Sequence, residues 1–250
     1  TPTSSSSIAK RGLSYNNPTY TIPFSTTHIT WTFNWYSALY TPSGVQTGYN
    51  TLLTFIPMLW SSASDLTSVW VANANAAIRS GADALLGFNE PDGCSDGGSC
   101  MDVATAVSAW KTWMEPFAGQ VKLGAPGVTN GGAPMGITWL QQFLGNCTAC
   151  HIDFVPIHWY YDCSTEANRN SFQTYVQGFH EQVKKPLWIT EFGCTSGDEA
   201  SVEAFLKMAV TWLDGQSYVE RYAYFMDAQG YLINSTGGLS TQGGIYNTYT

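Results

Sequence analysis

The sequence predicts an α/β protein of the (β/α)8 TIM-type barrel class, with an incomplete or irregular ring of helices. Three observations predict it. Eight short runs of β-forming residues follow one another at intervals typical of a strand–helix unit. Amphipathic helix patterns fill the later intervals. The length of 250 residues suits one barrel domain.

Each predicted strand is a short apolar run bounded by turn-forming residues. Spacing alone does not separate a barrel from an open doubly wound sheet. The chain lacks a Gly-x-Gly-x-x-Gly motif and a P-loop, so the nucleotide-binding form of the open sheet has no support. The predicted strands are Arg11–Tyr15, His28–Trp35, Leu52–Trp60, Ala84–Asn89, Val121–Pro126, Ile152–Tyr160, Leu187–Phe192 and Arg221–Met226.

Helices are predicted between the later strands. The first covers residues 64–80, with Ser64 as its N-cap and Gly81 just after its end. In the second, over 101–117, apolar residues recur every three or four positions, as on one face of a helix. The remaining predicted helices cover residues 136–144, 167–184 and 199–213.

The segments after the first two strands and after the last strand show no helix pattern. Prolines interrupt the early segments, and the segment after Met226 is rich in glycine, so all three are predicted to be loops. Residues 1–9 are predicted to be a disordered N-terminal stub. Residues 10–250 are predicted to form a single domain.

Composition excludes several classes of partner. Lys and Arg total 10 against 18 Asp and Glu, which gives a formal net charge of −8. Nucleic acids and anionic membranes attract basic patches, so neither is an expected partner. No apolar run is long enough to span a bilayer, so membrane insertion is not expected either. A monomer is expected.

The six cysteines and two glycosylation sequons, at Asn146 and Asn234, favour a secreted protein. Six cysteines allow 15 pairings. Pairing neighbours in sequence is the simplest choice, and a zinc site is disfavoured because no second ligand pair follows at finger spacing. This choice gives the pairs Cys94–Cys100, Cys147–Cys150 and Cys163–Cys194.

Two glutamates occupy matching positions at strand ends. Glu90 lies in ALLGFNEPD at the end of the fourth predicted strand, and Glu191 lies in PLWITEFG at the end of the seventh. Barrel active sites form at the carboxyl ends of the strands. Two carboxylates aimed at one pocket form the arrangement that a retaining glycosidase needs, with carboxyl groups about 5–5.5 Å apart.

These two motifs resemble the acid/base and nucleophile motifs of clan A glycoside hydrolases. The wider series KRGLSYN, ITWTFNW, FIPMLW, LLGFNEPD, LGAPG, DFVPIHWYYDC, LWITEFG and YAYFMD resembles glycoside hydrolase family 128, from residue 10 to about 248. The resemblance implies a (β/α)8 endo-β-1,3-glucanase core of the kind also found in alkali-sensitive-linkage-like fungal wall proteins. It therefore implies a β-glucan substrate and a location outside the cell or in the cell wall. The sequence shows no cofactor motif and its histidines show no metal-ligand spacing, so no cofactor and no metal are expected.

The resemblance also suggests residue roles. Glu90 is expected to be the general acid/base, with a pKa raised by burial and by the charge of Glu191, and Glu191 the nucleophile. Asn89 is expected to bind the sugar 2-hydroxyl. Tyr160 or a neighbour is expected to hold the nucleophile, and His158 to line a subsite.

Further strand-end residues are candidates for substrate binding. Asn34, Trp35 and Trp60 end the second and third predicted strands, so they are expected on the same rim, where they bind glycan. Asp92 is expected to cap the turn after Glu90. The alternative function is a non-hydrolysing β-glucan-binding wall protein on the same barrel, because fold does not fix function.

Overall fold

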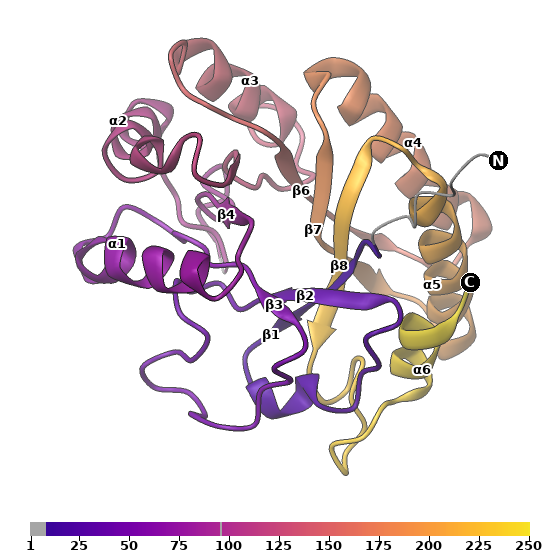
Figure 1. The fold of residues 1–250 in the computed structure, drawn as a ribbon. Coiled ribbons are helices and arrows are strands. Elements are labelled where there is room, and N and C mark those ends of the chain that lie inside the picture. The colour runs from indigo at the N-terminus through magenta and orange to yellow at the C-terminus, as the bar shows by residue number, and fades with distance from the viewer. Residues whose placement is uncertain (1–8, 96) are drawn as a thin grey trace, which may run out of the picture.

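The computed structural model describes residues 9–95 and 97–250 and contains all eight predicted strands (Figure 1). The predicted N-terminal stub lies outside the described residues, except for Ala9. The strands are β1 (Arg11–Tyr15), β2 (Ile29–Phe33), β3 (Thr54–Phe55), β4 (Ala84–Leu86), β5 (Lys122–Gly124), β6 (Val155–Asp162), β7 (Leu187–Ser196) and β8 (Val219–Asp227).

The strands are parallel and surround a common axis. Six of them form a sheet in the order β3-β2-β1-β8-β7-β6, and β4 and β5 form a second sheet. Isolated parallel bridges join the two sheets at both edges, between Met58 and Leu86 and between Gly124 and Phe154. The eight strands thus follow one another in sequence order around a barrel, and all their carboxyl ends lie on one side.

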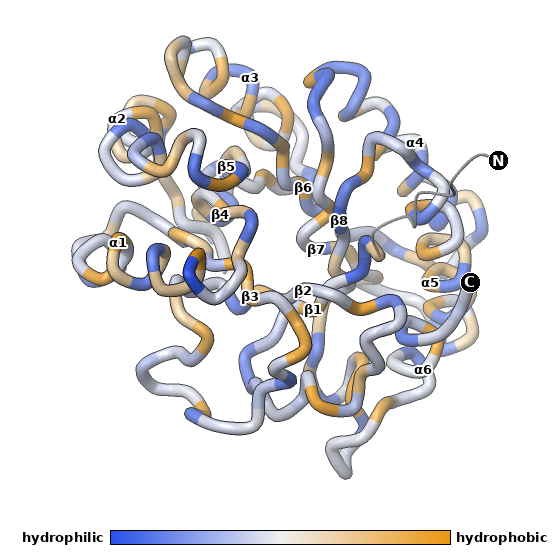
Figure 2. Tube along the Cα trace, in the orientation of Figure 1, coloured by the Kyte–Doolittle hydropathy of each residue, from blue (hydrophilic) through white to orange (hydrophobic). Residues whose placement is uncertain are grey.

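Six α-helices pack around the strands in the described chain, and hydrophilic and hydrophobic segments alternate along them (Figure 2). Short 3-10 helices follow β1 and α2, at Pro18–Thr21 and Glu115–Phe117. The α-helices are α1 (Ser64–Arg79), α2 (Val103–Trp113), α3 (Ile137–Asn146), α4 (Glu166–Val183), α5 (Glu199–Gly215) and α6 (Thr241–Thr248).

The structure corrects two predictions about helices. The segment after β8 was predicted to be a loop, but it contains α6, which Ser240 caps by accepting a hydrogen bond from the N–H of Gly243. A Cβ atom at Gly243 would lie 2.0 Å from the carbonyl oxygen of Leu232, so close packing requires this glycine despite its poor helix propensity. The N-cap of α1 is Ala63 rather than Ser64, and it makes no side-chain capping bond.

The apolar core has two layers. An inner cluster fills the barrel and includes the fully buried rings of Trp31 and Phe154. The ring of Trp31 occupies the place of a Cβ atom at Gly12, and the ring of Phe154 occupies that of a Cβ atom at Gly124. The lack of a side chain at these two glycines therefore lets the aromatic rings pack inside the barrel. A larger outer cluster lies between the strands and the helices.

All three predicted disulfides are confirmed: Cys94–Cys100, Cys147–Cys150 and Cys163–Cys194. The last of these joins the ends of β6 and β7, beside the site described below. The first closes a short loop after β4.

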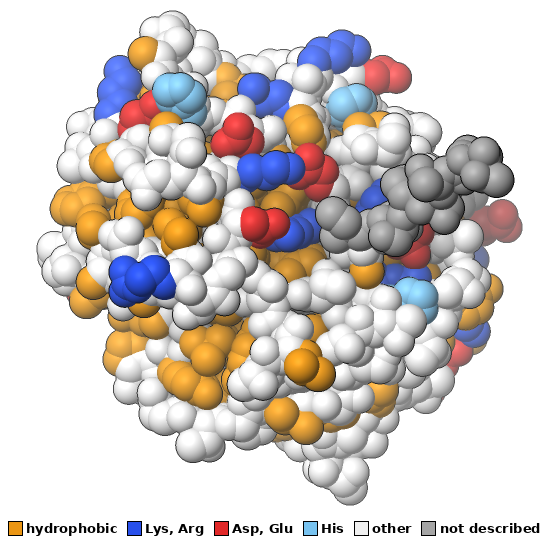
Figure 3. All heavy atoms as spheres, in the orientation of Figure 1, with side chains coloured by type: hydrophobic (Ala, Val, Ile, Leu, Met, Phe, Trp, Pro, Cys, Tyr) orange, Lys and Arg blue, Asp and Glu red, His pale blue; other side chains and the backbone are white. Residues whose placement is uncertain are grey.

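Charged side chains are sparse on the face drawn in Figure 3, and acidic and basic groups lie side by side near its centre. Within the described chain, no helix combines the length and hydropathy needed to cross a membrane.

Candidate active site

A cavity of about 480 Å³ opens at the carboxyl ends of the strands. This volume falls in the range of small-molecule sites, and the lining mixes aromatic rings with a few polar groups. The lining residues are Asn16, Trp35, Trp60, Asn89, Glu90, Gly97, Tyr160, Glu191, Phe225 and Met226.

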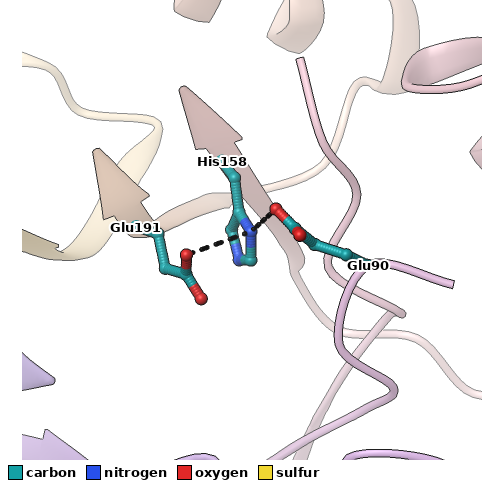
Figure 4. A group of neighbouring side chains, drawn as sticks. All are labelled: Glu90, His158 and Glu191. Atoms are coloured by element: carbon teal, nitrogen blue, oxygen red, sulfur yellow. Dashed lines mark hydrogen bonds and ion pairs between the residues drawn. The ribbon is translucent and has the colours of Figure 1, made fainter. Parts of the chain in front are cut away.

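Two carboxylates that line this cavity flank a buried histidine behind its surface. The imidazole of His158, on β6, lies between Glu90, after β4, and Glu191, on β7 (Figure 4). Its Nδ1 atom is 2.7 Å from Oε1 of Glu90 and 3.6 Å from Oε2 of Glu191. One ligand atom from each residue lies within 4.8 Å of the others.

The histidine reverses the expected direction of the pKa shift of Glu90. Burial alone would raise this pKa, as predicted, but the hydrogen bond and the charge of His158 outweigh burial and leave it below the ordinary value. Burial also disfavours the charged form of His158. The charge of Glu191 and the hydrogen bond to Glu90 overcome that effect and raise the pKa of His158. Both shifts favour a charged imidazole beside a charged carboxylate.

Two donors hold the carboxylate of Glu191. The indole N–H of Trp35 donates to Oε1 at 2.7 Å, and the hydroxyl of Tyr160 donates to Oε2 at 2.6 Å. Burial, followed by the charge of Glu191, raises the pKa of Tyr160, so the phenol stays protonated and can donate. Trp35, predicted as a glycan-binding side chain, thus turns its polar edge to a carboxylate.

The segments at the ends of β2 and β4 share a sequence motif and a backbone conformation. Each carries the sequence Phe-Asn-x, and the last residue, Trp35 or Glu90, has a left-handed backbone with φ of 57° or 43°. Non-glycine residues rarely adopt this conformation, and it clusters at functional sites. The left-handed residue reaches the cavity in both cases.

The asparagines before them anchor the loops. Asn34 is buried, and its amide donates to the carbonyl groups of Ala38 and Leu39. Asn34 was predicted to lie on the rim that binds glycan, but it is not one of the described residues that line the cavity. The amide of Asn89 donates to the carbonyl of Gly97. Its Oδ1 atom is buried with no hydrogen-bond partner in the described chain, so this cavity-lining residue keeps one acceptor unused.

Asp92 fastens a neighbouring loop rather than the turn after Glu90. Its carboxylate accepts hydrogen bonds from the hydroxyl and backbone N–H of Thr129 and from the N–H of Gly136. Gly136 is the N-cap of α3. Asp92 therefore accepts a hydrogen bond at the N-cap of a helix, from a residue that lies 44 positions later in the chain.

Six of the eight predicted site residues line the cavity, namely Trp35, Trp60, Asn89, Glu90, Tyr160 and Glu191. The two exceptions are Asn34, which lies behind the cavity, and His158, which was expected to line a subsite but is buried between the two carboxylates. Asn16 and Gly97 were not predicted for the site but also line it, and Phe225 and Met226, which close the eighth predicted strand, complete the lining. The repeated Phe-Asn-x motif is the sequence signal that Trp35 and Glu90 occupy equivalent positions at two strand ends.

The close approach of Glu90, His158 and Glu191 is also compatible with binding a cation. The side chains of all three residues already make hydrogen bonds within the protein. The same geometry is therefore explained by a shared proton, and it does not favour a bound metal ion.

Comparison with known proteins places the chain in a family context. Residues 12–246 match the family model described as glycosyl hydrolase catalytic core. A curated relative, alkali-sensitive linkage protein 1 of Schizosaccharomyces pombe, is 33% identical over 97% of this chain. The chain spans 45% of the length of that relative.

Three solved structures are similar over nearly the whole chain. A GH128 curdlan-specific exo-β-1,3-glucanase from Blastomyces gilchristii is 35% identical, with a TM-score of 0.81 and coverage of 96% of this chain and 97% of that one. An endo-β-1,3-glucanase from Sorangium cellulosum is 26% identical, with a TM-score of 0.81 and coverage of 96% and 98%. An endo-β-1,3-glucanase from Amycolatopsis mediterranei, in complex with laminaritriose and laminaribiose, is 28% identical, with a TM-score of 0.80 and coverage of 97% and 100%.

Proposed function

Because the chain belongs to the glycosyl hydrolase catalytic core family, we propose that it is an endo-acting β-1,3-glucanase that retains the anomeric configuration. The observation that carries the proposal is the cluster of Glu90, His158 and Glu191, in which one polar atom from each residue lies within 4.8 Å of the other two. The substrate is proposed from the similar solved structures, which are β-1,3-glucanases.

The separation of the two carboxylates supports retention. Inverting enzymes hold their carboxyl groups about 6.5–9.5 Å apart to leave room for a water molecule, whereas retaining enzymes hold them about 5–5.5 Å apart. One carboxylate oxygen of Glu90 lies within 4.8 Å of one carboxylate oxygen of Glu191, and so close an approach favours the shorter class.

In the first step, Glu191 attacks the anomeric carbon while the glycosidic oxygen leaves with a proton from Glu90. Trp35 and Tyr160 keep the Glu191 carboxylate aimed at that carbon. In the second step, Glu90 removes a proton from water, whose oxygen displaces Glu191 from the sugar. The Glu90–His158 hydrogen bond holds the exchangeable proton, so the pair titrates as a unit.

The free acceptor of Asn89 supports a role in substrate binding. A buried, unpaired carbonyl oxygen is costly, and a sugar 2-hydroxyl would satisfy it. Trp60 and Phe225 provide ring surfaces around the same cavity for the apolar faces of a glucan. His158 acts from behind this surface, because its side chain is buried.

The biological setting is proposed from less specific observations. Three disulfides fit a secreted protein. We propose that the protein acts as a monomer outside the cell, on β-glucan of a cell wall.

The test is product analysis on linear β-1,3-, β-1,4-, mixed-linkage and β-1,6-glucans, with Glu191→Gln as the matched control. We expect short β-1,3 oligosaccharides from the wild type, a retained configuration in the first product, and no release by the variant. Glucose as the sole early product would replace endo by exo action. Binding to β-1,3-glucan without release of any product would favour the non-hydrolysing wall protein.

A further inference from the structure

An irregularity in β7 places an additional side chain at the catalytic cluster. Along β6 and β7, Ile157 pairs with Ile189 and His158 pairs with Glu191, so Thr190 has no partner on β6. Successive residues of a regular strand point to opposite faces, whereas a bulge can re-aim one of them. Here both Thr190 and Glu191 approach the same imidazole, and the Oγ1 atom of Thr190 is 3.0 Å from Nε2 of His158.

We propose that Thr190 is a positioning residue, whose hydroxyl holds Nε2 of His158 so that Nδ1 faces Glu90 and exchanges a proton with it. The inference rests on the proposed function, in which Glu90 is the acid/base. Thr190 and His158 are each only 1% exposed, so water does not compete for this contact. Every polar atom of the imidazole then has a protein partner.

The hydroxyl suits both steps of the reaction. While the Glu90–His158 pair carries its exchangeable proton, Nε2–H donates to the oxygen of Thr190, whether that proton lies on Nδ1 or on Glu90. When the pair has lost the proton, Nδ1–H donates to the Glu90 carboxylate and the hydroxyl of Thr190 donates to Nε2. A hydroxyl can accept in one state and donate in the other by rotating.

The surroundings of His158 are acidic on several sides. Glu90 and Asp92 face it from the loop after β4, Glu191 faces it from β7, and the phenol of Tyr160 lies nearby on its own strand. These groups favour the protonated imidazole. Loss of the Thr190 acceptor weakens the charged N–H donor more than the neutral imidazole acceptor, because hydrogen bonds to charged groups are stronger.

The test compares wild type with Thr190→Val, which keeps the side-chain shape but removes the hydroxyl, and Thr190→Ser, which keeps the hydroxyl. We expect kcat/KM of the valine variant on laminari-oligosaccharides to fall about tenfold. In the plot of kcat/KM against pH, the loss of activity at the basic end should move to lower pH by roughly half a unit to one unit in the valine variant. The serine variant should recover most of both. A uniform loss at every pH, with the basic end of this plot unmoved, would show a merely structural role.

A second measurement is independent of activity. The imidazole resonances of ¹⁵N-histidine-labelled protein are titrated by NMR, with the signal of His158 assigned through its loss in His158→Asn. We expect the titration of His158 to shift to lower pH in Thr190→Val, while His28, His151 and His180 titrate as in the wild type. An unchanged His158 titration overturns the inference. Wild-type protein inactive on every glucan overturns the proposed function instead, and the NMR comparison still decides the role of Thr190.

Discussion

Trp35 directs an indole N–H, rather than a ring face, at the Glu191 carboxylate. Replacing it by phenylalanine keeps an aromatic ring but removes the donor. Because hydrogen bonds to charged groups contribute about 1.5–3 kcal/mol, we expect kcat of Trp35→Phe on β-1,3-glucan to fall roughly 10- to 100-fold. Steady-state kinetics with reducing-sugar detection measure the change.

Trp60→Phe is the matched control. Trp60 lines the same cavity, but none of its described contacts is a hydrogen bond to either glutamate. We expect its effect to lie mainly in KM. Equal losses of kcat in the two variants would contradict the role assigned to the Trp35 N–H.

The Glu90–His158 pair should also mark the pH dependence of stability. The pKa of Glu90 is lowered from 4.5, so its contribution is complete above that value and is lost as pH falls through the folded pKa. The pKa of His158 is raised from 6.5, so its contribution is complete below that value and is lost as pH rises through the folded pKa. Both contributions are complete between pH 4.5 and 6.5.

This pH window is tested by thermal unfolding of the wild type and of His158→Gln at pH values from about 3 to about 9. We expect the difference in Tm to be largest between the two ordinary pKa values and to shrink on both sides. A difference that does not vary with pH would mean that packing, rather than charge, accounts for the loss.

At the scale of elements, the Cys163–Cys194 disulfide joins the ends of the two strands that carry His158 and Glu191. It closes a separation of 31 residues, against 3 for Cys147–Cys150. The chain-entropy model gives about 3–4 kcal/mol for the longer loop and about half of that for the shorter one. We expect Cys163→Ala/Cys194→Ala to lower the free energy of unfolding by clearly more than Cys147→Ala/Cys150→Ala in urea titrations. The opposite order would contradict this entropic account.

The strands were predictable because buried parallel strands are short apolar runs, and each of the eight left that pattern in the sequence. The bulge at Thr190 was not, because β7 reads as a continuous run and the extra residue is defined only by its pairing with β6. Helix α6 was missed because Gly243 lowers helix propensity, while the contact with Leu232 that requires the glycine is tertiary.

The same distinction applies to the candidate site. Glu90 and Glu191 were found because strand order alone places them on one rim. The contact between His158 and Glu90 spans 68 residues, and only the folded barrel shows that it reverses the expected pKa of Glu90. Asn34 carries the same Phe-Asn pattern as Asn89, and only its hydrogen bonds reveal that it anchors a loop.

At the scale of the whole molecule, Arg11 ties the first strand to the end of the described chain. Its buried guanidinium bonds Asp214 on α5, the hydroxyl of Tyr222, and the carbonyl groups of Tyr246 and Tyr249. Asp214 is 39% exposed, and Arg11 keeps three acceptors without it. We expect Asp214→Asn to lower the free energy of unfolding by about 1–3 kcal/mol, measured by urea titration.

The control is Asp83→Asn, which breaks the pair with Arg221. Asp83 is 59% exposed, so its pair should contribute no more than about 1 kcal/mol. A loss in Asp83→Asn equal to that in Asp214→Asn would contradict the importance of burial around Arg11.

The pairing of β1 with β8 has a consequence for how the protein is made. The edge of β1 that receives β8 has no partner until residues 219–227 have left the ribosome, more than 200 residues after β1 itself. At bacterial or eukaryotic elongation rates this is a wait of about 10–40 s. During translation the nascent chain thus exposes an open strand edge, the kind of surface that chaperones cover. Silent codon changes that slow elongation between α5 and β8 should therefore lower the yield of folded protein without changing a single amino acid.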